Sequence, residues 1–431
     1  MHVWTNWAGN LRSVSARVTR PTSRDEVVAA VRAAAGDGFT VKAVGGGHSF
    51  NPIAVTTGLR LHLDALADPV RIDRGTRLVT VDAGMPLHRL NALLDAHGLA
   101  LPSLGDTTAQ TIAGALATGT HGSANLYGSL PSRVEAMELV TADGTLLRCD
   151  AEQHPEVLAA ARLGLGALGV VTEVTLRCVD AFTLHADEHN LLLYDLLAGL
   201  DQQLASTDHL ELRWLPYTER VRLIRRRVVA ASDRPASGWQ RWLFDDFLGN
   251  TVPGAACRIG RRHPGLQPAL SRVAAGVVPA RRYTGPSHTV FAAPQRVRFV
   301  AMEYAVPRPA LRDLLDGVRS IVDHLPFRVS FPVKVRFSPP DDVWLSPSYQ
   351  RETAHVLVAQ FAGTAYEEYF RRVEALATSL DGRPHWGTVH WRDAASLRAA
   401  YPRFDQMLAV RHKLDPGRMF TNPYLDRVLG P

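Results

Sequence analysis

The spacing of apolar residues predicts alternating short strands and helices over the first 180 residues. In PTSRDEVVAAVRAAAGDG, a Ser/Thr/Asp start signal precedes Val27, Val28 and Val31 at helical spacing, and glycines end the segment. TVKAV and RLVTVDAG are typical of strands, and PLHRLNALLDAHG of a helix that ends in glycine. VEAMELVTADGTLLRC predicts a hairpin around an Asp-Gly turn, and HPEVLAAARLGLGALGVVTEVTLRC predicts a helix, a glycine-rich turn and a strand.

Beyond Val179 the glycines become sparser, and residues 190–300 mix helix with Arg-rich strands. PRPALRDLLDGVRSIVDHL and EEYFRRVEALATSL predict amphipathic helices, whereas RVSFPVKVRF and TAHVLVAQFAG predict strands. The tail YPRFDQMLAVRHKLDPGRMFTNPYL predicts a helix and then a loop through Pro416, Gly417 and Pro423. We therefore predict an α+β protein with three parts: an N-terminal domain (1–178), a second α+β domain (179–400) and a C-terminal tail (401–431) that returns to the first domain.

Composition adds limits to this picture. The chain has 431 residues, of which 46% are hydrophobic and 21% charged, as expected for a globular protein of two or three domains. We find no signal pattern and no apolar run long enough to span a bilayer, so we expect a cytoplasmic protein without a membrane partner. The three cysteines (Cys149, Cys178 and Cys257) form no Cys-x-x-Cys pair, and we expect neither a disulfide framework nor a metal site.

The net charge is +6, and much of the basic charge lies between residues 219 and 282. An Arg-rich stretch of this kind is found on nucleic-acid-binding surfaces and equally on ordinary solvated ones. Because no recognised binding motif accompanies the charge, we expect no nucleic-acid partner. The sequence leaves the oligomeric state open.

Two glycine-rich segments carry the candidate chemistry. Gly45-Gly46-Gly47-His48-Ser49 follows a predicted strand, and the segment 105–123, GDTTAQTIAGALATGTHGS, is rich in glycine, threonine and serine. Consecutive glycines let backbone N–H groups approach a ligand, and such loops bind anions. Two of them in one domain suit a pyrophosphate. Neither segment matches GxGxxG with a following acidic residue or GxxxxGK[ST], which disfavours a nicotinamide enzyme and a P-loop protein.

The order of these motifs resembles a known family. GGGHSF after a strand, then AGALATGTHGS, then GLGALGVVTEVTL, is similar to the FAD-binding domain of the vanillyl-alcohol-oxidase superfamily. TNWAGN near the start, the late HWGT and the closing FTNPYLDRVLG are similar to its aldonolactone and alditol oxidase branch. The resemblance covers essentially the whole chain. It implies a two-part FAD-binding domain followed by an α+β substrate (cap) domain.

The resemblance also implies roles for single residues. His48 stands where many relatives carry a covalent bond to the flavin 8α-methyl group; the alternative is a histidine that only donates to phosphate. Further cofactor-binding positions are expected at the first loop, the second loop and the strand that follows them: Gly45, Gly46, Gly47 and Ser49; Gly105, Asp106, Thr111, Gly114, Thr118, Gly119, Thr120, His121 and Gly122; Val170 and Val171.

The substrate side departs from the family pattern. Alditol and lactone oxidases of this family have a Glu-x-Arg strand and a lysine in an HWGK segment, and here the corresponding segments are PVKVR and HWGT. Lys334 therefore replaces the family glutamate, Thr388 replaces the family lysine, and Arg336 remains. Period-2 alternation puts Lys334 and Arg336 on one face of their strand, so both can point into one pocket.

Two further substitutions lie nearby. Leu357 and Ala359 stand where alditol oxidases present polar side chains, and Asp106 stands where they have serine. A polyol would leave unpaired hydroxyl groups against this wall, each at a cost of about 1–3 kcal/mol. Our hypothesis is a larger, less hydroxylated or anionic substrate that Lys334 and Arg336 bind, and efficient turnover of xylitol or gulonolactone would refute it. The alternative is that Lys334 pairs with Asp106 and faces no substrate.

Oxidation of an alcohol needs a hydride acceptor and an acceptor for the hydroxyl proton. Lys334, His385 and His390 are the candidate bases, and late proton loss to water would need none. At Gly105 the family residue helps to control oxygen access, so the glycine favours an oxidase that passes electrons to O2 and releases H2O2. The alternatives are a sugar-lactone oxidase, a dehydrogenase with another electron acceptor, and a flavin-binding protein without activity.

Overall fold

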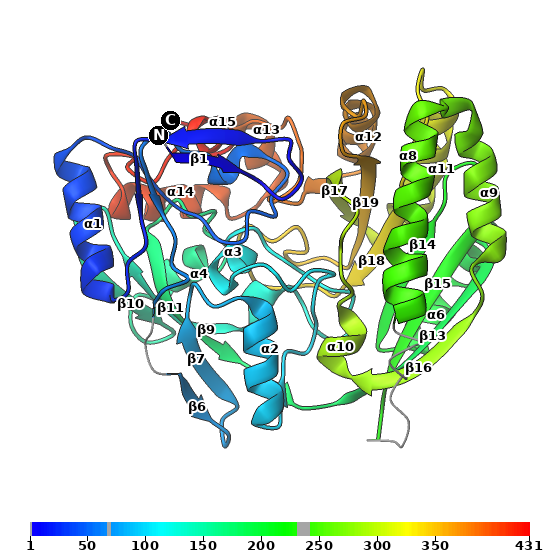
Figure 1. Cartoon of the computed structure of the whole chain (residues 1–431). Helices are drawn as coiled ribbons and strands as arrows, with labels where there is room; N and C mark the ends of the chain where they lie inside the picture. The colour runs from blue at the N-terminus through cyan, green and yellow to red at the C-terminus, as the bar shows by residue number, and fades with distance from the viewer. Residues whose placement is uncertain (1, 67–69, 231–241) are drawn as a thin grey trace.

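The computed structural model describes residues 2–66, 70–230 and 242–431. The α+β class that the sequence predicts is confirmed, because helices and strands alternate through the N-terminal half and mix in the C-terminal half (Figure 1). Part of the mixed region, 231–241, lies outside the described residues. No helix in the described part of the chain has the length and apolar character to cross a membrane.

The N-terminal part contains two larger sheets. A parallel sheet has the strand order β3-β5-β4, with β3 at Arg17–Thr19, β5 at Leu59–Leu61 and β4 at Val41–Ala43. An antiparallel sheet has the order β10-β9-β11-β7-β6, with bounds Leu146–Asp150, Val134–Val140, Val170–Arg177, Leu78–Asp82 and Arg71–Asp73. Two short pairs, β1 (His2–Thr5) with β2 (Arg12–Ser15) and β8 (Leu99–Ala100) with β12 (Val179–Asp180), complete the strands.

Helices cover these sheets. The Ser23 side chain caps the first helix by accepting from the Glu26 N–H, as the start signal predicts. The main helices are α1 (Arg24–Gly36), α2 (Leu87–Ala96), α3 (Ile112–Ala117) and α4 (Pro155–Ala161). Of these, α1, α2 and α4 lie at the predicted places, whereas α3 lies inside the second glycine segment, where the sequence pattern predicts no helix. The predicted hairpin is present as β9 and β10, in which Val140 pairs with Leu146 across the Asp-Gly turn.

The second part is built on one antiparallel sheet of eight strands, in the order β16-β13-β15-β14-β18-β19-β17-β20. The strands are β13 (Thr183–Leu192), β14 (His209–Trp214), β15 (Arg220–Val229), β16 (Arg281–Pro286), β17 (Phe299–Pro307), β18 (Val333–Ser338), β19 (Thr353–Phe361) and β20 (Arg383–Pro384). The helices here are α5 (Leu193–Ala198), α6 (Leu200–Ala205), α8 (Val252–Arg262), α9 (Gln267–Val277), α10 (Ser287–Phe291), α11 (Leu311–Asp323) and α12 (Glu367–Ser379), with a π-helical segment at Trp242–Thr251.

The two faces of this eight-stranded sheet differ in polarity. Leu212, Val335, Val356 and Tyr304 are register partners across β14, β18, β19 and β17, and they pack in one core with α11 and α12. Successive side chains on a strand point to opposite faces, so the other face carries the charged Arg213, Lys334, Arg336 and Glu303. The charges on this face therefore need polar partners when the face is covered.

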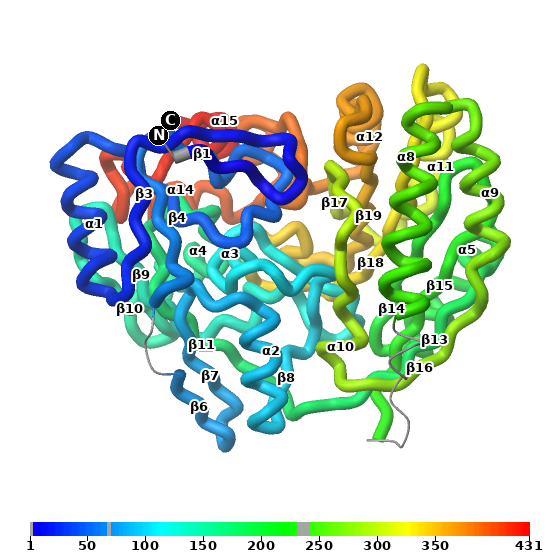
Figure 2. The backbone as a smooth tube through the Cα atoms, viewed as in Figure 1, coloured from blue at the N-terminus to red at the C-terminus, as the bar shows by residue number. Residues whose placement is uncertain are grey.

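The C-terminal region packs with the N-terminal part. Leu397, Phe404, Met407 and Leu425 belong to the same core as the helices α2, α3 and α4. The helices here are α13 (Ala394–Ala400), α14 (Phe404–Leu414) and α15 (Pro423–Leu429), and both chain ends lie on this side of the molecule (Figure 2). The prediction of a loop through Pro423 is wrong, because this proline is the first residue of α15, where its missing N–H costs nothing.

Candidate functional site

The two glycine segments meet in a cradle. An added Cβ at Gly45 would lie 2.1 Å from Thr111 Oγ1, and one at Gly46 would lie 2.5 Å from the Ala109 carbonyl oxygen. The first loop therefore packs directly against the start of α3, where the Thr111 side chain accepts from the Gly114 N–H. A cavity of about 250 Å³ opens beside these loops.

The lining of this cavity suits an extended nucleotide cofactor. Among the predicted cofactor residues, Gly45, Gly46, Thr111, Gly114 and Val171 line it. Further glycines and small apolar residues complete the walls, including Ala43, Gly84, Gly164, Gly166 and Gly169. A wall of backbone and small side chains lets N–H groups reach a pyrophosphate and leaves room for an adenine ring. The residues present thus fit FAD.

The remaining predicted cofactor residues lie outside this cavity lining. Gly47 has φ +66° and packs against Trp4, and Gly119 has φ +75° and faces Leu163. Thr118, Thr120 and Gly122 lie on the turn after α3, and Gly105, Ser49 and Val170 lie on the neighbouring segments. Their role in binding the cofactor stays a prediction.

His48 lies at the junction between the glycine loop and the eight-stranded sheet. Its ring stacks on Trp7 with centroids 5.6 Å apart, and Trp7 in turn contacts Phe50 and Phe299 edge to face. Burial lowers the pKa of His48 below its usual value. The imidazole is therefore neutral near pH 7 and keeps a nucleophilic lone pair.

Asp106 joins the second glycine segment to the sheet. Its carboxylate pairs with Lys334 Nζ at 2.8 Å and also with Arg336. Although burial opposes ionisation, Arg336 and Lys334 hold the pKa of Asp106 well below its usual value. Asp106 is thus ionised and a weak base, and the predicted pairing of Lys334 with Asp106 is present.

Two residues that the sequence analysis missed extend this network. Glu211 lies across the strand pair from Arg336, with Oε2 3.3 Å from Arg336 Nη2, and it accepts from Arg213 Nε at 2.6 Å. Burial opposes ionisation of Glu211, but Arg213 and Arg336 lower its pKa to about 2. Arg226 also pairs with Glu211, and Glu303 lies on the same face, so four cations (Arg213, Arg226, Lys334 and Arg336) stand against three carboxylates (Asp106, Glu211 and Glu303).

A buried carboxylate lies two strands further along the same face. Arg213, Lys334, Leu357 and Glu303 are register partners in line across β14, β18, β19 and β17. Lys334 occupies the position of the family glutamate, and Glu303 supplies a carboxylate to the same face from β17. The sequence offered only the alternation of β17 as a signal, without a motif.

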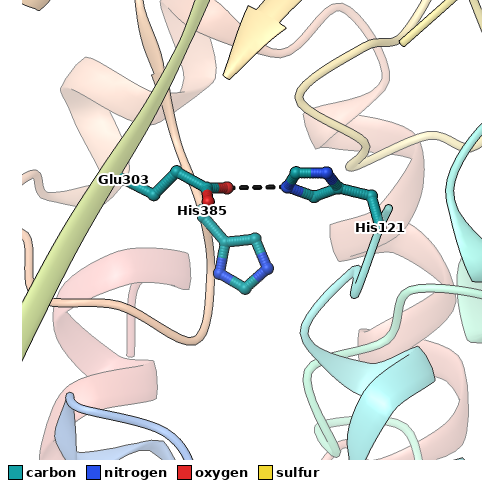
Figure 3. A group of neighbouring side chains, drawn as sticks. All are labelled: His121, Glu303 and His385. Carbon is teal, nitrogen blue, oxygen red and sulfur yellow. Dashed lines mark hydrogen bonds and ion pairs between the residues drawn. The ribbon is translucent and has the colours of Figure 1, made fainter. Parts of the chain in front are cut away.

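Three histidines surround Glu303, and Figure 3 draws two of them, His121 and His385. His121 Nε2 hydrogen-bonds to Glu303 Oε1 at 2.7 Å, and His121 Nδ1 lies 3.0 Å from the Gly122 carbonyl oxygen. The His355 ring stacks on His121 with centroids 3.7 Å apart. Burial opposes ionisation of Glu303, but His121 and then His385 hold its pKa well below the usual value. Both ring nitrogens of His121 face oxygen atoms, so its ring orientation is fixed from two sides.

His385 and Thr388 are both engaged by the backbone. The Gly387 N–H donates to His385 Nδ1 at 3.1 Å, and burial lowers the pKa of His385 to about 4. The Thr388 hydroxyl donates to the His385 carbonyl oxygen at 3.1 Å and accepts from the Glu303 N–H at 3.0 Å. His390 is buried against Tyr424, 2.8 Å away, which removes it from the cluster. Thr388 thus positions the cluster and has no free donor.

Ligand atoms of His121, Glu303 and His385 lie within 4.8 Å of one another, a spacing that a metal ion could use. Hydrogen bonds already engage His121 and Glu303, and the absence of a metal stays a prediction. The site as a whole lies where both ends of the second glycine segment, Asp106 and His121, contact the charged face of the sheet. It combines a cationic pair, a carboxylate and imidazole rings in one buried place.

Comparison with known proteins agrees with this geometry. Residues 15–150 match the FAD binding domain family, and residues 174–428 match the D-arabinono-1,4-lactone oxidase family. The L-gulono-1,4-lactone dehydrogenase of Mycobacterium tuberculosis is 39% identical over 432 residues, covering 100% of this chain and 99% of the relative. The L-gulonolactone oxidase of Bos taurus is 32% identical over 430 residues, covering 98% and 97%.

A solved structure shares the fold. A cholesterol oxidase of Brevibacterium sterolicum superimposes with a TM-score of 0.86 at 19% identity, covering 100% of this chain and 96% of that protein. The predicted resemblance to the aldonolactone and alditol oxidase branch is confirmed by the family matches. On these grounds the chain belongs to the D-arabinono-1,4-lactone oxidase family and is an FAD-binding oxidoreductase.

Proposed function

We propose that this protein is an FAD-dependent oxidase that converts a C–OH group of a small anionic molecule to C=O and passes the electrons to O2, giving H2O2. The observation that carries the proposal is the pair Lys334 and Arg336, which share one face of β18 with the Glu303 cluster and meet the second glycine segment at Asp106. Candidate substrate residues and a candidate cofactor residue, Asp106, are thus in contact, which supports the proposal.

Bound FAD would supply the acceptor for the hydride of the substrate C–H bond. The residues of this chain would bind and orient the substrate and exclude water. Lys334 and Arg336 would donate to its oxygen atoms, and Asp106 and Glu211 hold both cations in place. The Glu303 carboxylate would act as a fixed acceptor beside them, because its hydrogen bond to His121 holds its orientation.

The charge of the site favours an acid as substrate over a neutral polyol. The excess of one cation in the Asp106–Glu211 network matches one carboxylate or phosphate group. Leu357 and Ala359 form the apolar part of the same face, since they alternate with the core residues of β19. A polyol would leave hydroxyl groups unpaired against this part of the wall.

Steady-state kinetics tests this assignment. We expect small hydroxy acids to exceed xylitol and L-gulono-1,4-lactone in kcat/KM, and Lys334→Gln to lower kcat/KM for the acid by about 10- to 100-fold, the value of a charge-assisted hydrogen bond. The same variant should change turnover of neutral substrates far less. Efficient turnover of xylitol or the lactone by the unmodified protein would overturn the anionic-substrate proposal. If no substrate bleaches the bound flavin under anaerobic conditions, the result would indicate a flavin-binding protein without activity.

We further propose that FAD is attached through His48. The attachment would form a bond between a ring nitrogen of His48 and the 8α carbon of FAD, and the two hydrogen atoms lost would pass to O2. Two features support it: the lowered pKa of His48, which keeps the lone pair free, and the stacking on Trp7, which fixes the ring.

A second candidate function is a sugar-lactone dehydrogenase. The 39% identity to a relative of that name over the whole chain favours it. Gly105, which we expect to leave room for oxygen, favours the oxidase. Measuring H2O2 release against reduction of a dye under argon, with the same substrate, separates the two. The cytoplasmic location and the absence of a nucleic-acid partner stay predictions.

A further inference from the structure

The helices α8 and α9 lie side by side at the outer end of the eight-stranded sheet, away from the glycine loops (Figure 1). Their polarity is reversed relative to an ordinary surface helix. The residues that α8 buries are Gly254, Cys257 and Gly260, and those that α9 buries are Gln267, Ser271 and Ala275. A surface helix normally buries its large apolar side chains and exposes polar ones.

The large apolar residues of this region point outward instead. Val273 is 61% exposed and Val277 is 68% exposed, one helical turn apart on α9. Of the fourteen large apolar residues exposed in the described part of the chain, seven lie between residues 242 and 277: Trp242, Phe247, Val252, Ile259, Leu266, Val273 and Val277. Half of the exposed large apolar residues thus fall on two helices and the segment just before them, a concentration that marks an interaction site.

The same region is strongly basic. Residues 247–302 contain eight arginines and neither aspartate nor glutamate. Arg258, Arg262 and Arg272 are exposed and form no ion pair with any described residue. The acidic residues just before this stretch are neutralised, because Asp245 pairs with Arg281 and Asp246 pairs with Arg296. We call the exposed residues the α8–α9 face: Val252, Ile259, Leu266, Val273 and Val277 with Arg258, Arg262 and Arg272.

We propose that the α8–α9 face docks on the surface of a membrane that contains anionic lipids. Apolar side chains that enter the headgroup boundary and arginines that bind lipid phosphates are the combination that interfacial helices use. Trp242 and Phe247 stack on each other with centroids 5.8 Å apart beside α8, and tryptophan is enriched at the membrane interface. The docking is peripheral, since no described helix could span a bilayer.

Charge decides against a second copy of the chain as the occupant. Two such faces would set the unpaired arginines of one copy against those of the other, which repels; of the two carboxylates that line a pocket with Arg272, Glu219 is already paired with Arg319. A partner must therefore carry negative charge of its own. A lipid surface supplies it over a broad area and accepts apolar side chains without a matching pocket, which suits residues spread along two helices.

This proposal replaces the sequence-based expectation of no membrane partner. It does not rest on the proposed oxidase activity, because the α8–α9 face contains no residue of the candidate site.

Vesicle co-sedimentation of the flavin-containing protein tests the proposal. One set of vesicles is phosphatidylcholine alone, and the other is phosphatidylcholine mixed with phosphatidylserine. We expect binding to the mixed vesicles, weakened by added salt, and at least about tenfold weaker binding to the neutral ones. Val273→Gln/Val277→Gln and Arg262→Glu/Arg272→Glu should each lower the partition coefficient about tenfold or more.

Matched controls keep the result specific. Leu192→Gln/Tyr194→Gln changes two exposed apolar residues elsewhere on the same sheet domain, and Arg12→Glu/Arg89→Glu changes two exposed arginines of the N-terminal part. Both should bind vesicles like the unmodified protein, and all variants should keep its flavin spectrum. Equal binding by the face variants and the controls would overturn the proposal. A second result would also overturn it: the protein binds no vesicles and instead forms a dimer, or a complex with an acidic protein, and Val273→Gln/Val277→Gln abolishes that assembly.

Discussion

Removing the Asp106 carboxylate should destabilise the protein more than removing the lysine that it pairs with. In Asp106→Asn, Lys334 and Arg336 stay buried and charged with their shared anion gone, and only Arg336 keeps a second carboxylate in Glu211. In Lys334→Gln, Asp106 keeps its pair with Arg336, so no buried charge is left alone. The asymmetry follows from which partner remains, because an uncompensated buried charge costs more than a lost attraction.

The structure sets the size of both effects. Unit charges 2.8 Å apart attract by about 6 kcal/mol at an effective dielectric constant of about 20, and desolvation offsets most of this. Breaking a buried pair costs about 3–5 kcal/mol. Because the Asp106 side chain is 20% exposed and asparagine keeps an acceptor, we expect about 2–4 kcal/mol for Asp106→Asn. For Lys334→Gln we expect about 1–2 kcal/mol, the value of a charge-assisted hydrogen bond.

Urea unfolding at pH 7, followed by tryptophan fluorescence, measures both values. Because the pKa of Asp106 is lowered in the folded protein, its contribution to the free energy of unfolding is complete above the ordinary aspartate pKa. This contribution is lost only as the pH falls below that pKa, so measurements at pH 7 report all of it. Asp405→Asn is the matched control, because it breaks an exposed pair with Arg398 and should cost less than about 1 kcal/mol.

A double variant gives the refuting result. Asp106→Asn/Lys334→Gln should be less destabilised than the sum of the single variants, by about 1–3 kcal/mol, since the lysine charge is harmful only when Asp106 is absent. If Lys334→Gln costs as much as Asp106→Asn, or if the two changes add, the buried ion network is not organised around Asp106.

Three other predictions concern the cofactor half. His48→Ala should release its flavin on acid precipitation, whereas the unmodified protein should keep a yellow pellet; a colourless pellet from both would contradict covalent attachment. Gly45→Ala should weaken FAD binding at least about tenfold in a fluorescence titration, because its Cβ would meet Thr111 Oγ1 at 2.1 Å, whereas Gly36→Ala, with no atom within 4 Å, should bind normally. Burial lowers the pKa of Lys42 to about 7, so above that pH the unfolded chain binds more protons and stability should rise by about 2 kcal/mol from pH 7 to 9. Urea unfolding of Lys42→Met should lack this rise; a rise of equal size in the variant would assign it to other groups.

Local pattern was sufficient for most elements of the fold. The Ser23 cap, the valines of α1 and the Asp-Gly hairpin follow from interactions between residues a few positions apart, which the sequence displays directly. The prediction at Pro423 is wrong because a proline disfavours a helix interior but is tolerated at the first helical position. Only the capping residue Asn422 distinguishes these two cases in the sequence.

The candidate site shows the limit of such reasoning. Alternation along β18 predicts that Lys334 and Arg336 share a face, and the glycine segments predict an anion cradle. Neither predicts Glu303, because β17 joins the site through register with β19, set by hydrogen bonds between strands far apart in the chain.

The sequence by itself therefore determined the cofactor class, the α+β elements and the departure of Lys334 and Thr388 from the family pattern, since each is written in consecutive residues. The tertiary structure decided which charges meet. It placed Asp106 against Lys334, gathered His121 and His385 around Glu303, and turned the apolar side of α9 outward. These pairings arise from the crossing of distant segments and from the packing of two faces of one sheet, and both depend on long-range contacts.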